Sequence, residues 1–382
     1  MTDPIAPSPV APLPKARLKA WLPLLVGAIL ALSFLEYART HILIKLADAG
    51  FGAETAGFAQ RGQITQCSDA IDSDKCVATW TRAGKPPTVL WFGNSQLSGI
   101  NRYRPGDVNA PELLRRALAA RGKYLVTYSQ PNANLTEEAI VWNAIAPVYR
   151  PKLLILPVCY DDIRELGVRE TVGDFTERKG VVASLEAQRY WPVIAGSMQE
   201  SLKAASPQVA EGHQSLQTRV EREATGFLAR YWSLWRAKPS LRGTLGFAIH
   251  TLRNQMLGIH STSKRPVDAN VYRDRMELLD GMVADARAQG ADVLLYVPPY
   301  RQDIDGPYPM AQYRAFKTEL QALAKRHGAG FVDIDPIVPG PEWATVTDEL
   351  FGFKEADFMH FTAAGHKRLA AGIDQTARRM GY

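Results

Sequence analysis

The sequence predicts an α/β fold, a three-layer α/β/α sandwich built on a mostly parallel sheet. The main observation is that short apolar runs alternate with longer segments of helical periodicity over most of the 382 residues. The second observation is that the turns between these segments are short. A third observation adds one N-terminal transmembrane helix, because Trp21 to Leu35 form an uncharged stretch near the start of the chain.

The N-terminal segment is predicted to anchor the chain in a membrane. Residues 1–16 form a Pro- and Ala-rich cytoplasmic tail, and the helix is expected over 17–38. Basic residues precede the uncharged stretch and favour a cytoplasmic N-terminus: Lys15, Arg17 and Lys19. We therefore expect a single-pass inner-membrane protein whose C-terminal part lies in the periplasm. A cleaved signal peptide is the alternative, because Ala31-Leu32-Ser33 is compatible with a cleavage site.

Residues 39–87 are expected to form a polar periplasmic connector. Cys67 and Cys76 lie close together in its polar part, and a disulfide there would staple a loop in an oxidising compartment. Metal binding is the alternative for this pair, but the acids between the cysteines lie at no recognisable ligand spacing. The third cysteine, Cys159, follows an apolar run and is expected to be a packed thiol.

Residues 88–382 carry the alternation of strands and helices. Expected strands are rich in Val, Leu, Ile and aromatic residues and cover 88–92, 124–129, 152–158, 292–297 and 330–334. Expected helices cover 111–122, 135–148 and about 363–380. Two further helices are indicated by apolar faces, one at Tyr272, Met276, Leu279 and Val283 and one at Tyr313, Phe316, Leu320 and Leu323. The continuous apolar run within 152–158 is typical of a parallel strand buried on both faces.

The alternation stops between about 165 and 268, which predicts a helical insertion. One helical face in it is apolar and aromatic, with basic residues nearby: Phe227, Tyr231, Leu234 and Trp235. These side chains either pack onto helices of the domain or form an amphipathic surface that lies on the bilayer or a membrane partner.

Composition and charge narrow the choice of partners. The chain is 46% hydrophobic and 22% charged, which is ordinary for a globular protein, and its net charge is +6. The basic residues are spread along the chain among acidic ones and form no nucleic-acid-binding module. A mildly basic surface that faces an anionic membrane or polymer is the simpler interpretation. We expect no nucleic-acid partner, no cofactor and no metal.

The first strand of the domain ends at Gly93-Asn94-Ser95, which makes Ser95 a candidate nucleophile. The carboxyl edge of a parallel sheet is where α/β domains bind their ligands, and a serine in the turn after a strand lies there. The alternative is that Ser95 is simply a turn residue.

Asp357 and His360 are predicted to complete a catalytic triad with Ser95. They lie three residues apart before the last helix, so the carboxylate can reach the imidazole. It would keep one ring nitrogen protonated and leave the other free to take the proton of the serine. A metal site at this pair would need a third ligand that the sequence does not offer. His366 is expected on the solvated face of the last helix.

A Gly-x-Ser after the first strand, with Asp-x-x-His before the last helix, resembles the SGNH (GDSL-type) hydrolase superfamily over roughly residues 86–380. The resemblance implies a flavodoxin-like sandwich with Ser95, Asp357 and His360 as the catalytic residues. It also implies an oxyanion and substrate-binding region at Asn132, Asn134 and Asp161, whose donors are the Ser95 N–H, amides or side chains near Asn132 and Asn134, or groups of a rearranged loop.

Two positions depart from the pattern of this superfamily. The second block of the family supplies a glycine where this chain has Asn134, and the third block, Gly-x-Asn-Asp, has Cys159 and Asp161 in place of the glycine and the asparagine. An ionised Asp161 cannot donate to an oxyanion, and its charge would oppose the developing negative charge. A capped turn after the strand is the structural alternative for Asp161 and Asp162.

With the predicted anchor, the chain is similar to membrane-anchored SGNH proteins, the DltD-like acyl-transfer proteins. Such proteins work with a membrane-bound O-acyltransferase that hands an acyl group across the bilayer. The resemblance therefore implies a serine O-acyltransferase, with the membrane-bound acyltransferase, the lipid bilayer and an acceptor polysaccharide of the cell surface or periplasm as partners. The alternatives are an anchored carbohydrate esterase that removes acetyl groups and a non-catalytic accessory subunit of an acylation complex.

Overall fold

A computed structural model describes residues 26–27, 30–34, 37, 55–57, 65–205, 253–254, 256–347 and 354–382. All of these residues from Thr55 on belong to one compact unit. Within the described ranges, no helix is long and apolar enough to cross a membrane. Most of the helix predicted over 17–38 lies outside the described residues, so the anchor stays a prediction.

The centre of this unit is a six-stranded sheet in which every neighbouring pair of strands is parallel. In spatial order the strands are β2 (Gln66–Cys67), β5 (Tyr124–Ser129), β3 (Thr88–Gly93), β6 (Leu153–Pro157), β7 (Asp292–Val297) and β8 (Gly330–Asp333). The central strands β3 and β6 are buried along their whole length, because helices cover both faces of the sheet. The predicted mostly parallel sheet is confirmed.

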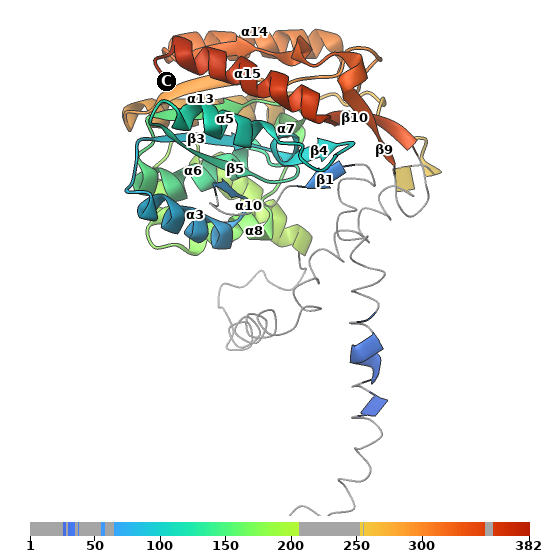
Figure 1. Cartoon of the computed structure of the whole chain (residues 1–382), viewed down its shortest axis with the longest axis horizontal. Coiled ribbons are helices and arrows are strands. Elements are labelled where there is room, and N and C mark those ends of the chain that lie inside the picture. Colours follow the sequence, from blue (N-terminus) through green and yellow to red (C-terminus); the bar gives the residue numbers. More distant parts are fainter. Residues whose placement is uncertain are drawn as a thin grey trace, which may run out of the picture. The chain divides into compact units, whose positions relative to one another are not determined.

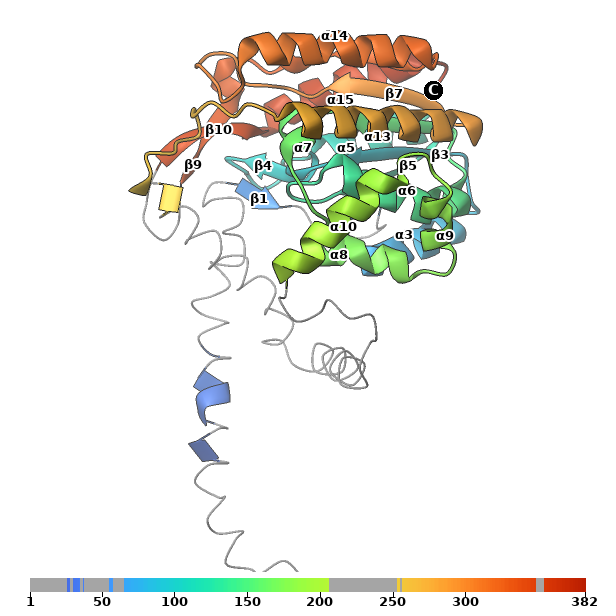
Figure 2. The same cartoon turned by 180° about the vertical axis from the view of Figure 1, so that it is seen from behind.

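Helices form a layer on each face of the sheet (Figure 1). On one face, α5 (Ala110–Ala119) and α15 (Ala363–Arg379) pack with the sheet in one apolar cluster. The larger apolar cluster on the other face includes side chains of α3 (Ala70–Arg82), α6 (Leu135–Tyr149), α13 (Ala269–Ala288) and α14 (Met310–Arg326). Figure 2 shows the second layer from its outer side.

Two short antiparallel pairs of strands accompany the main sheet. One joins β1 (Thr55–Gly57) to β4 (Gly99–Asn101), and the other joins β9 (Trp343–Thr347) to β10 (Lys354–Phe361). β4 and β10 contact each other. The sequence analysis did not indicate these pairs. β1 and β4 have three residues each, too few to show a periodicity, and the alternation of β10 is interrupted by a bulge.

The described part of the predicted insertion is helical. It contains α8 (Glu170–Gly173), the 3₁₀ turn η3 (Asp174–Glu177), α9 (Val181–Glu186) and α10 (Trp191–Ala205). Residues 206–252, which include the aromatic face around Phe227 and Trp235, lie outside the described residues.

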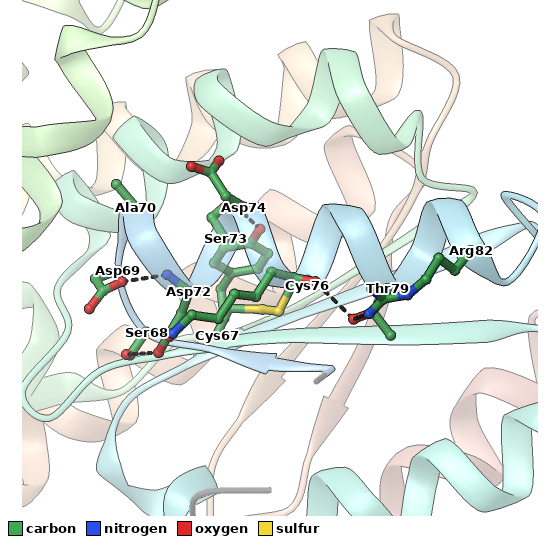
Figure 3. The surroundings of a disulfide bond; sticks show 12 residues. Cys67, Ser68, Asp69, Ala70, Asp72, Ser73, Asp74, Cys76, Thr79 and Arg82 are labelled. Atoms are coloured by element: carbon green, nitrogen blue, oxygen red, sulfur yellow. Dashed lines mark hydrogen bonds and ion pairs between the residues drawn. A yellow bond between two sulfur atoms is a disulfide. The ribbon is translucent and has the colours of Figure 1, made fainter. Parts of the chain in front are cut away.

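The predicted disulfide between Cys67 and Cys76 is confirmed (Figure 3). It joins the edge strand β2 to α3, whose first turn is capped by the Asp69 carboxylate accepting from the Asp72 N–H. The stretch 65–87, expected to belong to a polar connector, thus contributes a strand and a buried helix face to the domain. Cys159 is a free, buried thiol, as expected.

Candidate active site

Ser95 lies on a tight turn at the carboxyl end of β3. Asn94 caps the short helix α4 (Ser95–Ser98), and its side-chain oxygen accepts a hydrogen bond of 3.0 Å from the Gln96 N–H. A Cβ at Gly93 would lie 2.4 Å from a methyl carbon of Leu97, so a side chain at this position would clash with α4. The strand, the glycine and the cap together place Ser95 at the edge where parallel strands end.

The structure brings the three predicted triad residues together. The Ser95 Oγ lies 2.9 Å from the His360 Nε2, although the two residues are 265 positions apart in the sequence. The His360 Nδ1 lies 3.0 Å from the Asp357 Oδ2. With a carboxylate at Nδ1, that nitrogen carries the proton, and Nε2 is the acceptor for the serine O–H. The arrangement can remove the proton of Ser95 as its oxygen attacks.

The Asp357 carboxylate is buried and held by several donors. Its Oδ1 accepts from the backbone N–H groups of Met359 and His360 at 2.8 and 2.9 Å, and its Oδ2 also accepts from the Asn101 amide at 3.1 Å. Burial alone would raise the pKa of Asp357. The charge of the His360 ring once it is protonated, the hydrogen bond from that ring and those from the backbone N–H groups of His360 and Met359 outweigh burial and hold the pKa of Asp357 below its usual value. Asp357 is therefore ionised when His360 works as a base.

Asn101 is a site residue that the sequence analysis missed. Its side chain is fully buried on β4 and donates to the Asp357 carboxylate and to the Thr345 carbonyl, at 3.1 and 3.2 Å. It therefore orients the acid of the triad. No pattern in the sequence marks this asparagine, because the contact depends on two strands from opposite ends of the domain.

Asp357 and His360 lie on a bulge of the β9–β10 hairpin. The pairing runs through Ala356, opposite Thr345, and resumes only at Phe361, opposite Trp343, so the residues between them are out of register. A bulge of this kind redirects side chains away from the plane of the strand pair. Here His360 reaches Ser95 at the start of α4, and Asp357 reaches Asn101 on β4.

Asn134, predicted near the oxyanion, has a structural role as the cap of α6. Its side-chain oxygen accepts from the Glu137 N–H, its own N–H donates to the Glu137 carboxylate, and its amide donates to the Gly167 carbonyl. Asn132 is exposed and has a left-handed backbone, with φ of 55°. The oxyanion role of both residues stays a prediction. The Ser95 N–H is an available donor, because the first residue of a helix has no intrahelical acceptor.

Asp161 and Asp162 have different surroundings. Asp161 accepts a hydrogen bond from the Tyr308 hydroxyl at 3.2 Å, and Arg164 and Arg265 lie 3.2 and 3.8 Å from its carboxylate. Two cations thus offset the charge that the sequence analysis placed in the oxyanion region. Both residues lie in the first turn of α7 (Tyr160–Arg164), where carboxylates suit the helix dipole.

Asp162, rather than Asp161, contacts the turn that carries the nucleophile. The Asn94 amide donates to both of its carboxylate oxygens, at 3.3 and 3.2 Å. Burial raises the pKa of Asp162 well above its usual value, although the Asn94 hydrogen bond opposes this shift. Asp162 therefore connects α7 to the cap of α4.

His366 does not lie on the solvated face of the last helix, so that expectation is wrong. Its ring is completely buried, donates from Nε2 to the Gly99 carbonyl at 3.0 Å, and accepts from the Ala110 N–H at its Nδ1. Burial lowers the pKa of His366 to about 4, so the ring is neutral at ordinary pH. It connects α15 to β4 and α5, because the face of α15 that carries it packs against the sheet.

Among the residues that the structure describes, no group of three or more His, Cys, Asp or Glu side chains could hold a metal ion. A parallel α/β sandwich with a hydrogen-bonded Ser-His-Asp triad at the carboxyl edge of its sheet has the architecture of a serine hydrolase.

No model of a known protein family matches this chain, and no curated protein matches it significantly. Among solved structures, it is similar to a lipase/acylhydrolase from Enterococcus faecalis, with 13% identity over 76% of this chain and 96% of the other and a TM-score of 0.38. A catalytic mutant of Axe2, an acetylxylan esterase from Geobacillus stearothermophilus, has 12% identity over 76% and 93% of the two chains and a TM-score of 0.36. A GDSL-like lipase from Bacteroides thetaiotaomicron has 9% identity over 80% and 98%, also with a TM-score of 0.36. At TM-scores this low, the roles of residues in this chain are inferred from its own geometry.

Proposed function

We propose that this protein is a membrane-anchored serine O-acyltransferase that passes an acyl group to hydroxyls of an envelope polysaccharide. The observation that carries the proposal is the continuous hydrogen-bonded chain from the Ser95 hydroxyl through His360 to the buried Asp357 carboxylate. The same observation disfavours a non-catalytic accessory subunit, because a site that had lost its activity would not be expected to retain all three groups within hydrogen-bonding distance.

The first half of the reaction forms an acyl-enzyme. The Ser95 Oγ attacks the carbonyl carbon of the acyl donor while His360 Nε2 takes the hydroxyl proton. The carbonyl oxygen becomes negatively charged and is stabilised by the Ser95 N–H. The tetrahedral intermediate then breaks its bond to the leaving oxygen, which receives the proton from His360, and the acyl group stays on Ser95 as an ester.

The second half of the reaction regenerates the serine. An acceptor hydroxyl gives its proton to His360 and attacks the acyl carbon, and Ser95 leaves with the proton that His360 returns. With a sugar hydroxyl as acceptor the product is an acylated polysaccharide; with water it is a free acid, which is the esterase alternative. Ser95 is 4% exposed, which restricts the access of water and of a sugar hydroxyl alike, so the acceptor is decided by the test in cells.

The anchor and the partners belong to this proposal. The basic-flanked uncharged stretch within 17–38 supports a single-pass inner-membrane protein with its catalytic domain in the periplasm. In that position the domain could receive its acyl group from a membrane-bound O-acyltransferase and deliver it to a polysaccharide. The disulfide between Cys67 and Cys76 supports an oxidising compartment.

The proposal is tested in cells by the acyl content of the envelope polysaccharide. Ser95→Ala should abolish acylation, while the matched variant Ser98→Ala, which alters another serine of α4, should leave it at the wild-type level. An increase in acylation in the Ser95→Ala strain would instead identify an esterase. Wild-type acylation in that strain would contradict both enzymatic functions.

A further inference from the structure

The Gln96 side chain links the nucleophile to the base. This residue directly follows Ser95 and is 4% exposed, and its amide nitrogen donates to the Pro299 carbonyl at 3.0 Å and to the Met359 carbonyl at 3.2 Å. Pro299 lies in the segment after β7, and Met359 directly precedes His360. One amide therefore connects three segments of the site that are separated by 203 and 263 positions in the sequence.

Because these hydrogen bonds are buried, they fix the positions of the two segments that accept them. A primary amide carries two hydrogens, and both are used here on carbonyl oxygens that would otherwise need another donor. Leaving such a buried carbonyl without a donor costs about 1–3 kcal/mol. The segments that contain Pro299 and Met359 are therefore most stable where both carbonyls lie within hydrogen-bonding distance of the Gln96 amide. The Gln96 N–H is in turn fixed by the Asn94 cap, which holds the residue on the first turn of α4.

The segment that Gln96 holds is the part of β10 that lacks regular strand pairing. Residues between Ala356 and Phe361 are out of register with β9, so the Met359 carbonyl lies in the bulge and not in a paired stretch of the ladder. The Asp357 carboxylate stabilises the bulge by accepting from the Met359 N–H. Arg301 joins the two strands by donating to the Ala344 carbonyl of β9 at 2.7 Å and to the Asp357 carbonyl of the bulge at 3.4 Å. Together with the hydrogen bond between Ser95 and His360, Gln96 ties the bulge to the helix that carries the nucleophile.

We propose that Gln96 is a positioning residue that sets the distance between the Ser95 hydroxyl and the His360 ring. This inference deepens the proposed function and rests on it, because it assigns Gln96 a role in activating the same serine. Gln96 touches neither reacting atom, and it acts through the backbone of Met359. Proton transfer from serine to imidazole depends steeply on this distance, and small displacements of catalytic groups reduce rates by up to about 100-fold.

The test compares Gln96→Leu with wild type in the full-length protein, using hydrolysis of p-nitrophenyl acetate and covalent labelling by a fluorophosphonate. We expect kcat and the labelling rate to fall together by about 10- to 100-fold, with KM changed less than about twofold, because the Gln96 amide is engaged with two backbone carbonyls. The control is Gln66→Leu on the edge strand β2. Like Gln96, Gln66 makes two hydrogen bonds through its side-chain amide, both with Asn109. This control should keep the wild-type rates.

A second comparison separates positioning from general stability. In the His360→Ala background, Gln96→Leu should cause no further loss of the residual rate, because a residue that acts through the imidazole has nothing left to position. A further loss in that background, or wild-type kcat and labelling in the single variant, would overturn the proposal. If wild type and Ser95→Ala are equally unlabelled, the proposed function fails instead, so the two failures are distinguishable.

Discussion

Single residues show most clearly what the sequence could and could not predict. Asp357 and His360 were identifiable because a triad needs a carboxylate beside an imidazole, and a spacing of three residues before a helix supplies it. Asn101 and Gln96 gave no such signal. Each is an ordinary amide whose role depends on Asp357 or Met359, which lie more than 250 positions away in the sequence.

His366 was misplaced although the sequence contains the signal that would have placed it. Leu369, Ala370 and Ile373 follow it at spacings of three, four and seven residues, which puts all of them on one face of α15. The polarity of histidine alone suggested a solvent-exposed side chain. In the structure, the buried ring of His366 makes hydrogen bonds with the Gly99 carbonyl and the Ala110 N–H. Periodicity was the better guide than residue type here.

The buried neutral ring of His366 predicts that stability falls in acid. Its pKa is about 4 in the folded protein, against about 6.5 in an unfolded chain, so between these values the unfolded state binds more protons. The contribution of His366 to stability is fully present above its pKa in the unfolded chain. That contribution is lost as the pH falls toward its pKa in the folded protein. Between pH 7 and pH 5 the free energy of unfolding should fall by about 2 kcal/mol through this group.

Urea unfolding of wild type and His366→Gln at both pH values measures this effect. The variant should lack that part of the pH dependence, whatever its stability at pH 7. Equal pH dependence in wild type and His366→Gln would show that His366 does not titrate between the two states.

At the scale of elements, long apolar runs and periodic helices were predictable and short strands were not. β3, β6 and β7 are recognisable because a buried parallel strand is apolar throughout. β4 and β10, which carry Asn101, Asp357 and His360, are a three-residue strand and a bulged strand. The parts of the fold that shape the site are thus those with the weakest local signal.

The disulfide is the element-scale feature most open to experiment. It closes a loop between residues nine positions apart and joins β2 to α3, so removing it should lower the free energy of unfolding by about 2–3 kcal/mol by the loop-entropy estimate. Chemical denaturation of the Cys67→Ala/Cys76→Ala variant measures this loss, and Cys159→Ala serves as the control that keeps the disulfide. Two free thiols at Cys67 and Cys76 in non-reducing mass spectrometry of protein isolated from the periplasm would contradict the pairing.

At the scale of the whole molecule, the proposal requires the catalytic domain to be outside the cytoplasm and attached to a membrane. The prediction depends on the basic residues before the uncharged stretch, which favour a cytoplasmic N-terminus. Alkaline phosphatase fused after Tyr382 should therefore be active and remain in the membrane fraction. Activity in the soluble fraction would indicate cleavage near Ser33, and an inactive phosphatase would contradict the predicted orientation.

The central claim is that Ser95 is a nucleophile activated by His360. The most direct measurement is labelling of the full-length protein with a fluorophosphonate, followed by peptide mass spectrometry. We predict one adduct, on Ser95, which is lost in Ser95→Ala and nearly lost in His360→Ala. The adduct should be retained in Ser98→Ala, whose melting temperature should equal that of the wild type. An unlabelled Ser95 in folded wild-type protein, or equal labelling of wild type and His360→Ala, would contradict the claim.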